Sequence, residues 1–148
     1  MTISANKPVL VGDLMTQPVA VINPGTRVRE AVELMRRHNV RHLPVVSDGI
    51  LEGFLSQNDI RETLGFQADD LQVKERLDWA VFRVMNEDGP RLTPEQPIRH
   101  AIDVFLASKA GAIPVVAQGS RQLVGILSNL DVLRAARDLF LEPERADR

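Results

Sequence analysis

Two segments of the sequence carry the same pair of polar residues, a serine followed three positions later by an aspartate. The pairs are Ser56 with Asp59 and Ser128 with Asp131. Each follows an alternating apolar run, so each is predicted to lie where a strand ends and a helix begins. Such a junction exposes backbone N–H groups and the positive end of a helix dipole. A serine hydroxyl there can donate to a phosphate oxygen, and a carboxylate can accept hydrogen bonds from the vicinal hydroxyls of a ribose.

The same spacing also fits a capping box, in which the serine caps the helix and the acidic side chain bonds back to the serine N–H. Gly53 and Gly125 precede the two pairs. They are either ordinary strand glycines or points where backbone or ligand approaches closely. From these residues alone, a nucleotide site and a pair of helix caps both remain open.

The elements that position these pairs occur twice along the chain. A shift of 70 residues aligns Met15 with Met85, and the register becomes 72 after a two-residue insertion near Ser120. An insertion confined to one turn is what a duplicated structural unit tolerates. We therefore predict two repeats at 1–68 and 81–148, with a connecting helix at 69–80 whose apolar period continues to residue 84.

Each repeat is predicted to have the order β-α-β-β-α. In the first, a strand over 19–22 precedes a helix capped by Thr26, because Pro24 and Gly25 break the strand. That helix ends before Pro44. A strand over 43–46, a hairpin turn at 47–49 and an alternating strand over 51–56 follow, and a helix starts near Asn58. The fold class is therefore α+β.

The ordered set of motifs resembles a CBS motif, named for cystathionine β-synthase, present twice. The first copy is carried by residues 13–19, 30–31, 41–46 and 53–59, and the second is clearest at 113–116 and 125–131. The resemblance implies a CBS pair, or Bateman module, with two tandem β-α-β-β-α repeats packed about a pseudo-twofold axis. It also implies clefts between the repeats that bind adenine nucleotides or adenosyl ligands such as AMP, ADP, ATP or S-adenosylmethionine and regulate a partner. Family members commonly form homodimers through exposed apolar helix faces.

The resemblance also implies a role for individual residues. Asp59 and Asp131 would hold ribose hydroxyls, and Ser56 and Ser128 would face phosphate. Residues 19–21 would border the base, with Leu43 and Pro44 as apolar walls. The full set of expected ligand-binding residues is Thr16, Pro18, Val19, Val21, Arg41, His42, Leu43, Pro44, Ser56, Asp59, Ile113, Pro114, Ser128 and Asp131.

The two expected sites differ in charge. Arg41 and His42 stand before Leu43 in the first repeat, where a guanidinium can pair with a polyphosphate. Their counterparts are Gly111 and Ala112, which carry no charge. The site of the first repeat is therefore the better candidate for an anionic ligand.

Composition excludes several other functions. The 148 residues carry a net charge of −2, which offers no positive field for nucleic acid, and the absence of cysteine rules out thiolate metal sites and Cys nucleophiles. No acid–base or nucleophile set converges, so the chain is not expected to be an enzyme. His38 and His42 have a metal-ligand spacing, but their helix should end between them. No secretory signal or membrane span is visible, so the protein is expected to be cytoplasmic. Its expected partner is an unidentified effector protein. The alternative function is a purely structural interaction module without a ligand.

Overall fold

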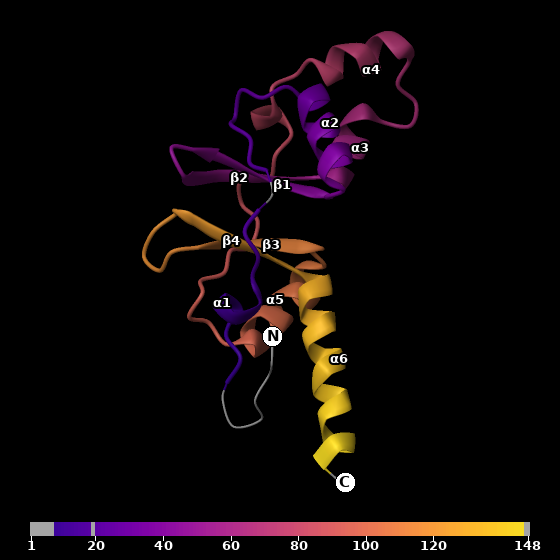
Figure 1. The fold of residues 1–148 in the computed structure, drawn as a ribbon. Helices are drawn as coiled ribbons and strands as arrows, with labels where there is room; N and C mark the ends of the chain where they lie inside the picture. The colour runs from indigo at the N-terminus through magenta and orange to yellow at the C-terminus, as the bar shows by residue number, and fades with distance from the viewer. Residues whose placement is uncertain (1–7, 19, 147–148) are drawn as a thin grey trace. The chain divides into compact units, whose positions relative to one another are not determined.

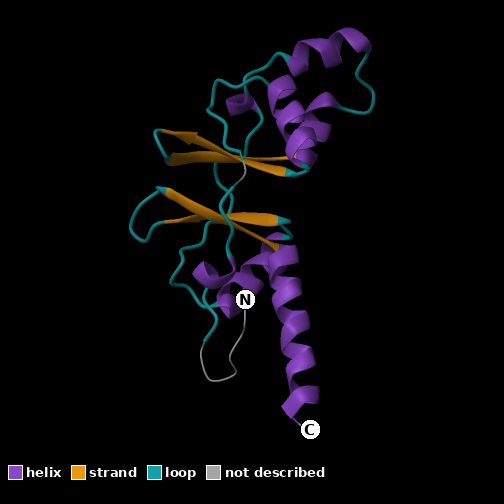
Figure 2. Ribbon diagram, viewed as in Figure 1, coloured by secondary structure: helices purple, strands orange, loops and turns teal. Residues whose placement is uncertain are grey.

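The computed structural model describes residues 8–18 and 20–146 and has an α+β fold, as predicted (Figure 2). The chain divides into two compact units. We call Pro18–Gly89 the contiguous unit, and Met1–Gln17 together with Pro90–Arg148 the split unit. None of the helices in the described part of the chain is long and apolar enough to cross a membrane.

The contiguous unit is a two-stranded antiparallel sheet covered on one face by helices (Figure 1). Its strands are β1 (His42–Ser47) and β2 (Ile50–Ser56), and its helices are α2 (Val28–His38), α3 (Gln57–Leu64), α4 (Asp70–Leu77) and the 3-10 turn η1 (Val81–Arg83). The alternation of the strands turns Leu43, Val45 and Leu55 toward the helices, where they are fully buried. The opposite face of the sheet therefore carries the intervening side chains, including His42 and Phe54.

The split unit repeats this plan. Its strands are β3 (Ala112–Val116) and β4 (Leu123–Ser128), and its helices are α1 (Val11–Leu14), α5 (Ile98–Ser108) and α6 (Asn129–Ala146). Its core is formed by fully buried apolar side chains from both segments of the unit: Val11, Leu92, Ala101, Ile113, Val115 and Leu127.

Local sequence explains where these elements begin and end. Asp48 and Gly49 both adopt positive φ, 50° and 81°, which matches the twist of a tight hairpin between β1 and β2. Helix α2 stops at Asn39, a residue in the left-handed conformation (φ 52°) that asparagine tolerates better than most side chains. The predicted end of this helix before Pro44 is thereby confirmed.

The segment that begins each repeat packs against the elements of the other repeat, an arrangement that we call exchanged packing. In the split unit, the Val11 N–H donates to the carbonyl of Gln96 at 2.9 Å. In the contiguous unit, the Val81 N–H donates to the carbonyl of Thr26 at 2.7 Å. Each donor and acceptor of the first pair lies 70 residues from its counterpart in the second. Residues 8–17 therefore complete the core built by the second repeat, and residues 80–86 complete the core built by the first.

Gly53 and Gly125 make this exchange possible. A Cβ at Gly53 would lie 2.6 Å from the sulfur of Met85, and a Cβ at Gly125 would lie 2.7 Å from the sulfur of Met15. Real Cβ atoms do not approach other heavy atoms so closely, so the glycines leave room for the two methionines. The close approach that the sequence left open is thus made by core side chains.

Three local predictions differ from the structure. Among the described residues of 19–22, only Ile22 pairs with β1, as a single parallel bridge to Val45. Helix α2 takes Arg27 as its N-cap, while the Thr26 hydroxyl accepts the N–H of Asn23. The connecting helix is shorter than predicted, because α4 ends at Leu77.

Candidate functional site

The two Ser–Asp pairs form capping boxes at the starts of α3 and α6. The Asp59 N–H donates to Ser56 Oγ at 3.0 Å, and the Ser56 N–H donates to Asp59 Oδ2 at 2.9 Å. The corresponding distances for Ser128 and Asp131 are 3.1 and 2.9 Å. Capping is therefore one role that both pairs perform.

Capping leaves part of each pair uncommitted. A hydroxyl has one donor besides its acceptor lone pairs, and a carboxylate has two oxygens. The box uses Ser56 only as an acceptor and Asp59 only through Oδ2. Within the described residues, the Ser56 hydroxyl proton and Asp59 Oδ1 have no hydrogen-bond partner. The pair can therefore donate to an anion and accept from a hydroxyl while the cap stays intact.

The second pair is partly neutralised by its own helix. Arg134 Nη1 lies 3.9 Å from Asp131 Oδ1, the oxygen that the box leaves over. The position that corresponds to Arg134 in α3 is Glu62, which cannot form such a pair. A hydroxyl ligand at Asp131 would therefore compete with a guanidinium, whereas one at Asp59 would not.

Arg41 lies next to the start of α3. Its carbonyl accepts the N–H of Gln57, the first residue of that helix, at 2.8 Å. The side chain of Arg41 is exposed and forms no ion pair within the described part of the chain. Its guanidinium is therefore available to an anion from solvent.

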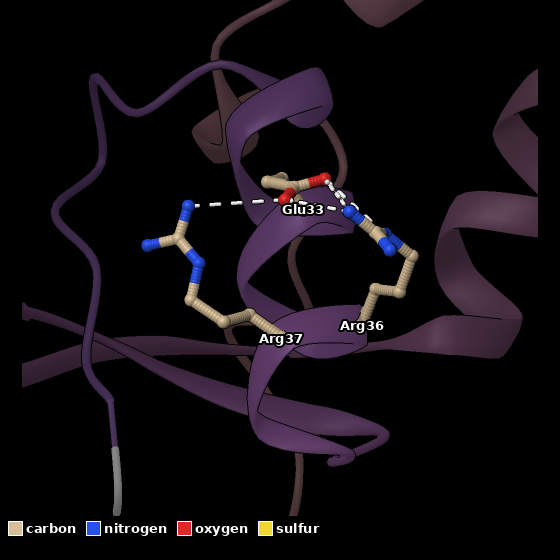
Figure 3. A network of polar contacts seen from close by, with 3 residues as sticks. All are labelled: Glu33, Arg36 and Arg37. Atoms are coloured by element: carbon tan, nitrogen blue, oxygen red, sulfur yellow. Dashed lines mark hydrogen bonds and ion pairs between the residues drawn. The ribbon is translucent and has the colours of Figure 1, made fainter.

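Two other arginines of this region are already paired. Arg36 Nη2 lies 2.8 Å from Glu33 Oε1, and Arg37 Nη2 lies 3.8 Å from the same oxygen (Figure 3). Both belong to the last turn of α2, where a positive charge interacts favourably with the helix dipole. Of these three arginines, Arg41 is the one that remains for a ligand.

His42 lies on the same face of the sheet as Ser56, its register partner in β2. Its ring stacks on Phe54 with 5.4 Å between centroids and 15° between planes. Burial lowers the pKa of His42 below its ordinary value, Asp59 opposes that shift, and Arg41 adds to it. Together these effects favour the uncharged imidazole.

The other expected ligand-binding residues are distributed over both units. Val21 is exposed, and its backbone N–H and carbonyl form no hydrogen bond within the described residues. Pro18 lies at the start of the contiguous unit, and Val19 lies outside the described residues. Thr16 pairs instead with Ile126 of β4 and so belongs to the split unit.

Leu43 and Pro44, which were expected as apolar walls, are buried, and so are Ile113 and Pro114 in the second repeat. The side chain of Leu43 belongs to the core of the contiguous unit, and Ile113 belongs to the core of the split unit. Leu43 and Ile113 therefore support their sheets from the helix-covered face.

Sequence reasoning missed Phe54 as a neighbour of the site. Its position, two residues before Ser56 on an alternating strand, was the available signal, because residues i and i+2 share a face. Among the described residues, no group of three or more His, Cys, Asp or Glu side chains could hold a metal ion.

Comparison with known proteins identifies the relatives of this chain. The family model described as CBS domain matches residues 11–65 and 81–138. The CBS domain-containing protein YhcV of Bacillus subtilis is 32% identical over 118 residues, which cover 80% of this chain and 79% of YhcV. Other curated relatives are longer: the chain covers 46% of an uncharacterized protein, MJ1225, of Methanocaldococcus jannaschii and 23% of a homoserine O-acetyltransferase of Methanocorpusculum labreanum.

Solved structures share the fold. The structure of CBSX2 in complex with AMP is similar with a TM-score of 0.75 and 30% identity, covering 88% of this chain and 97% of that one. The CBS domain pair of protein MJ0100, in complex with 5′-methylthioadenosine and S-adenosyl-L-methionine, has a TM-score of 0.73 and 23% identity, over 87% of this chain and 96% of that one. The second likeness concerns the fold alone.

Proposed function

The chain belongs to the CBS domain family, whose members are generally regulatory rather than catalytic, and we propose that it is a sensor of adenine nucleotides or related adenosyl ligands. The ligand binds in the contiguous unit, beside the start of α3. The observation that carries this proposal is the uncommitted hydroxyl proton of Ser56 next to the uncommitted Oδ1 of Asp59. CBSX2, which is 30% identical, is a structural relative in complex with AMP.

Each residue of the site has a defined task in this proposal. Asp59 Oδ1 accepts hydrogen bonds from the ribose hydroxyls, and the Ser56 hydroxyl donates to phosphate. Arg41 supplies a charge-assisted contact to the phosphate, which is stronger than a contact between neutral groups. The backbone of Val21, which forms no hydrogen bond within the described residues, offers a donor and an acceptor to the base edge. The site needs no metal or other cofactor for these contacts.

A calorimetric titration of the protein with AMP, ADP, ATP and S-adenosylmethionine tests this function. We expect at least one of the three nucleotides to bind more tightly than S-adenosylmethionine, because Arg41 adds a contact to the phosphate. Binding only to S-adenosylmethionine would contradict the role of Arg41, because that ligand brings a positive charge near it. If none of the four ligands binds at millimolar concentration, the module serves instead as a structural interaction domain, for which its satisfied capping boxes would suffice.

Signalling requires that the ligand bind two states of the protein unequally. We propose that these states differ in the pairing of two copies of the chain through α5 and α6. Leu106, Leu130 and Leu133 on these helices are 73%, 55% and 62% exposed. Their counterparts in the contiguous unit are Arg36, Asn58 and Arg61, so these three positions are apolar in the split unit and polar in the contiguous unit.

The double variant Leu106→Arg with Leu133→Arg gives the split unit the residues of its counterpart. We expect this variant to sediment as a monomer while the parent protein sediments as a dimer, because two charges would be buried at the apolar face. Phe66→Arg, at a fully exposed position of the contiguous unit, is the matched control and should leave the dimer intact. A parent protein that is monomeric at all concentrations would contradict this part of the proposal.

A further inference from the structure

His42 occupies a position that neither the cap nor the core requires. It is the first residue of β1, on the sheet face opposite the buried side chains of Leu43 and Val45. Its ring is held by the stack on Phe54 and lies opposite Ser56 in the strand register. The imidazole is therefore fixed beside the start of α3, where the proposed ligand carries its phosphate.

Two charged groups act on this imidazole. Asp59 approaches from α3 and favours the protonated ring, whereas Arg41, directly before β1, disfavours it. The largest effect is burial, which lowers the pKa of His42 below its ordinary value. The free protein therefore favours the neutral imidazole, which is influenced by one carboxylate and one guanidinium.

From this geometry we propose that binding of an anionic nucleotide takes up a proton on His42, so that affinity rises as the pH falls. This inference rests on the proposed function and names its regulation. A phosphate placed between Arg41 and Ser56 neutralises the positive charge of Arg41, which otherwise disfavours protonation of His42. The phosphate also adds a negative charge beside the ring. The imidazolium becomes favoured in the complex, and its N–H donates to the ligand.

The sign of the effect follows from linkage. The complex binds the proton more tightly than the free protein, so the pKa of His42 is higher in the complex. Affinity therefore increases as the pH falls through the pKa of the complex and levels off below the pKa of the free protein. Each unit of difference between the pKa of His42 in the complex and its pKa in the free protein corresponds to about a tenfold change in affinity.

The split unit provides an internal comparison. Ala112 and Ile126 stand at the positions of His42 and Phe54, so this unit has neither the titrating ring nor the stack that holds it. A ligand beside Asp131 would find no titrating ring at the corresponding position of its own unit. The proton linkage is thus specific to the site in the contiguous unit.

A proton NMR titration of the histidine rings tests the electrostatic arrangement without any ligand. We expect Asp59→Ala to lower the pKa of His42 and Arg41→Gln to raise it. His38 and His100, both exposed, are the control residues. If neither variant moves the titration of His42, the arrangement is wrong and the inference is overturned, whatever binds.

Calorimetric titration with AMP at a series of pH values tests the linkage itself. AMP has a phosphate that titrates near pH 6, so its own contribution must be separated. His42→Gln retains that contribution and removes the proton uptake by the ring. We expect the parent protein to gain about tenfold more affinity than His42→Gln between pH 8 and pH 5.5, for a difference of about one pKa unit.

Two other outcomes are distinguishable. If AMP binds but the parent protein and His42→Gln show the same pH dependence, the linkage is overturned while the proposed function stands. If none of AMP, ADP, ATP and S-adenosylmethionine binds to either protein at any pH, the proposed function fails and the linkage fails with it.

Discussion

Replacement of Asp59 by alanine is expected to weaken nucleotide binding by about 10- to 100-fold. The variant removes the acceptor for the ribose hydroxyls, and a hydrogen bond to a charged group contributes about 1.5–3 kcal/mol. It also removes the acceptor for the Ser56 N–H in the capping box, and this loss costs about 1 kcal/mol of stability. Calorimetric titration with the best-binding nucleotide measures the first effect, and urea unfolding measures the second.

Asp131→Ala is the matched control for this prediction. It breaks the same capping box in α6 at a similar cost in stability. It leaves the contiguous unit untouched, so nucleotide affinity should change by less than about twofold, well under 1 kcal/mol. Equal losses of affinity in the two variants would show that the capping box, and not the ribose contact, explains the effect of Asp59.

Val11→Ala is expected to destabilise the protein by about 2 kcal/mol and to perturb the second repeat rather than the first. The Val11 side chain is fully buried in the core of the split unit, so its truncation removes buried methyl groups and leaves a cavity. Val81→Ala is the counterpart in the contiguous unit, where Val81 is also fully buried. It should cost about as much and perturb the first repeat.

Urea unfolding gives the two stabilities, and amide chemical shifts of the folded variants give the location. For Val11→Ala the largest shift changes should fall within residues 90–128, and for Val81→Ala within residues 22–60. The opposite pattern, in which Val11→Ala perturbs β1 and β2, would contradict the exchanged packing. Trp79, the one tryptophan of the sequence, packs against the core of the contiguous unit and gives an independent fluorescence signal for it.

Local chemistry explains why much of the fold could be predicted. The hairpin between β1 and β2 needs two residues with positive φ, and Asp48 with Gly49 supplies them. The capping boxes follow from a spacing of three residues between serine and aspartate, which allows the same pair of hydrogen bonds at the start of any helix. These features depend on neighbours within a few positions, so the sequence alone contains them.

The exchanged packing depends on contacts that no short window contains. Met15 lies against Gly125, more than one hundred residues away, and Met85 lies against Gly53. The repeat suggested that each unit would be built from consecutive residues, because the two copies follow one another along the chain. The pairing of a methionine with the glycine of the other repeat is decided by tertiary packing.

The candidate site shows the same division. Ser56 and Asp59 could be found from sequence because they stand at one strand–helix junction. The antiparallel pairing of β1 with β2 brings Arg41 and His42 beside that junction. Leu43 was expected to face the ligand, but its direction depends on which face of β1 the helices cover. The stack of His42 on Phe54 likewise depends on the register of the two strands, which the sequence does not specify residue by residue.

A titration of the isotopically labelled protein with AMP, followed by amide chemical shifts, tests the central claim most directly. We predict that the amides of Val21, Ser56 and Asp59 shift first and saturate together, while those of Ser128 and Asp131 stay in place. Shifts confined to the start of α6, or scattered over exposed residues without saturation, would contradict a nucleotide site beside α3.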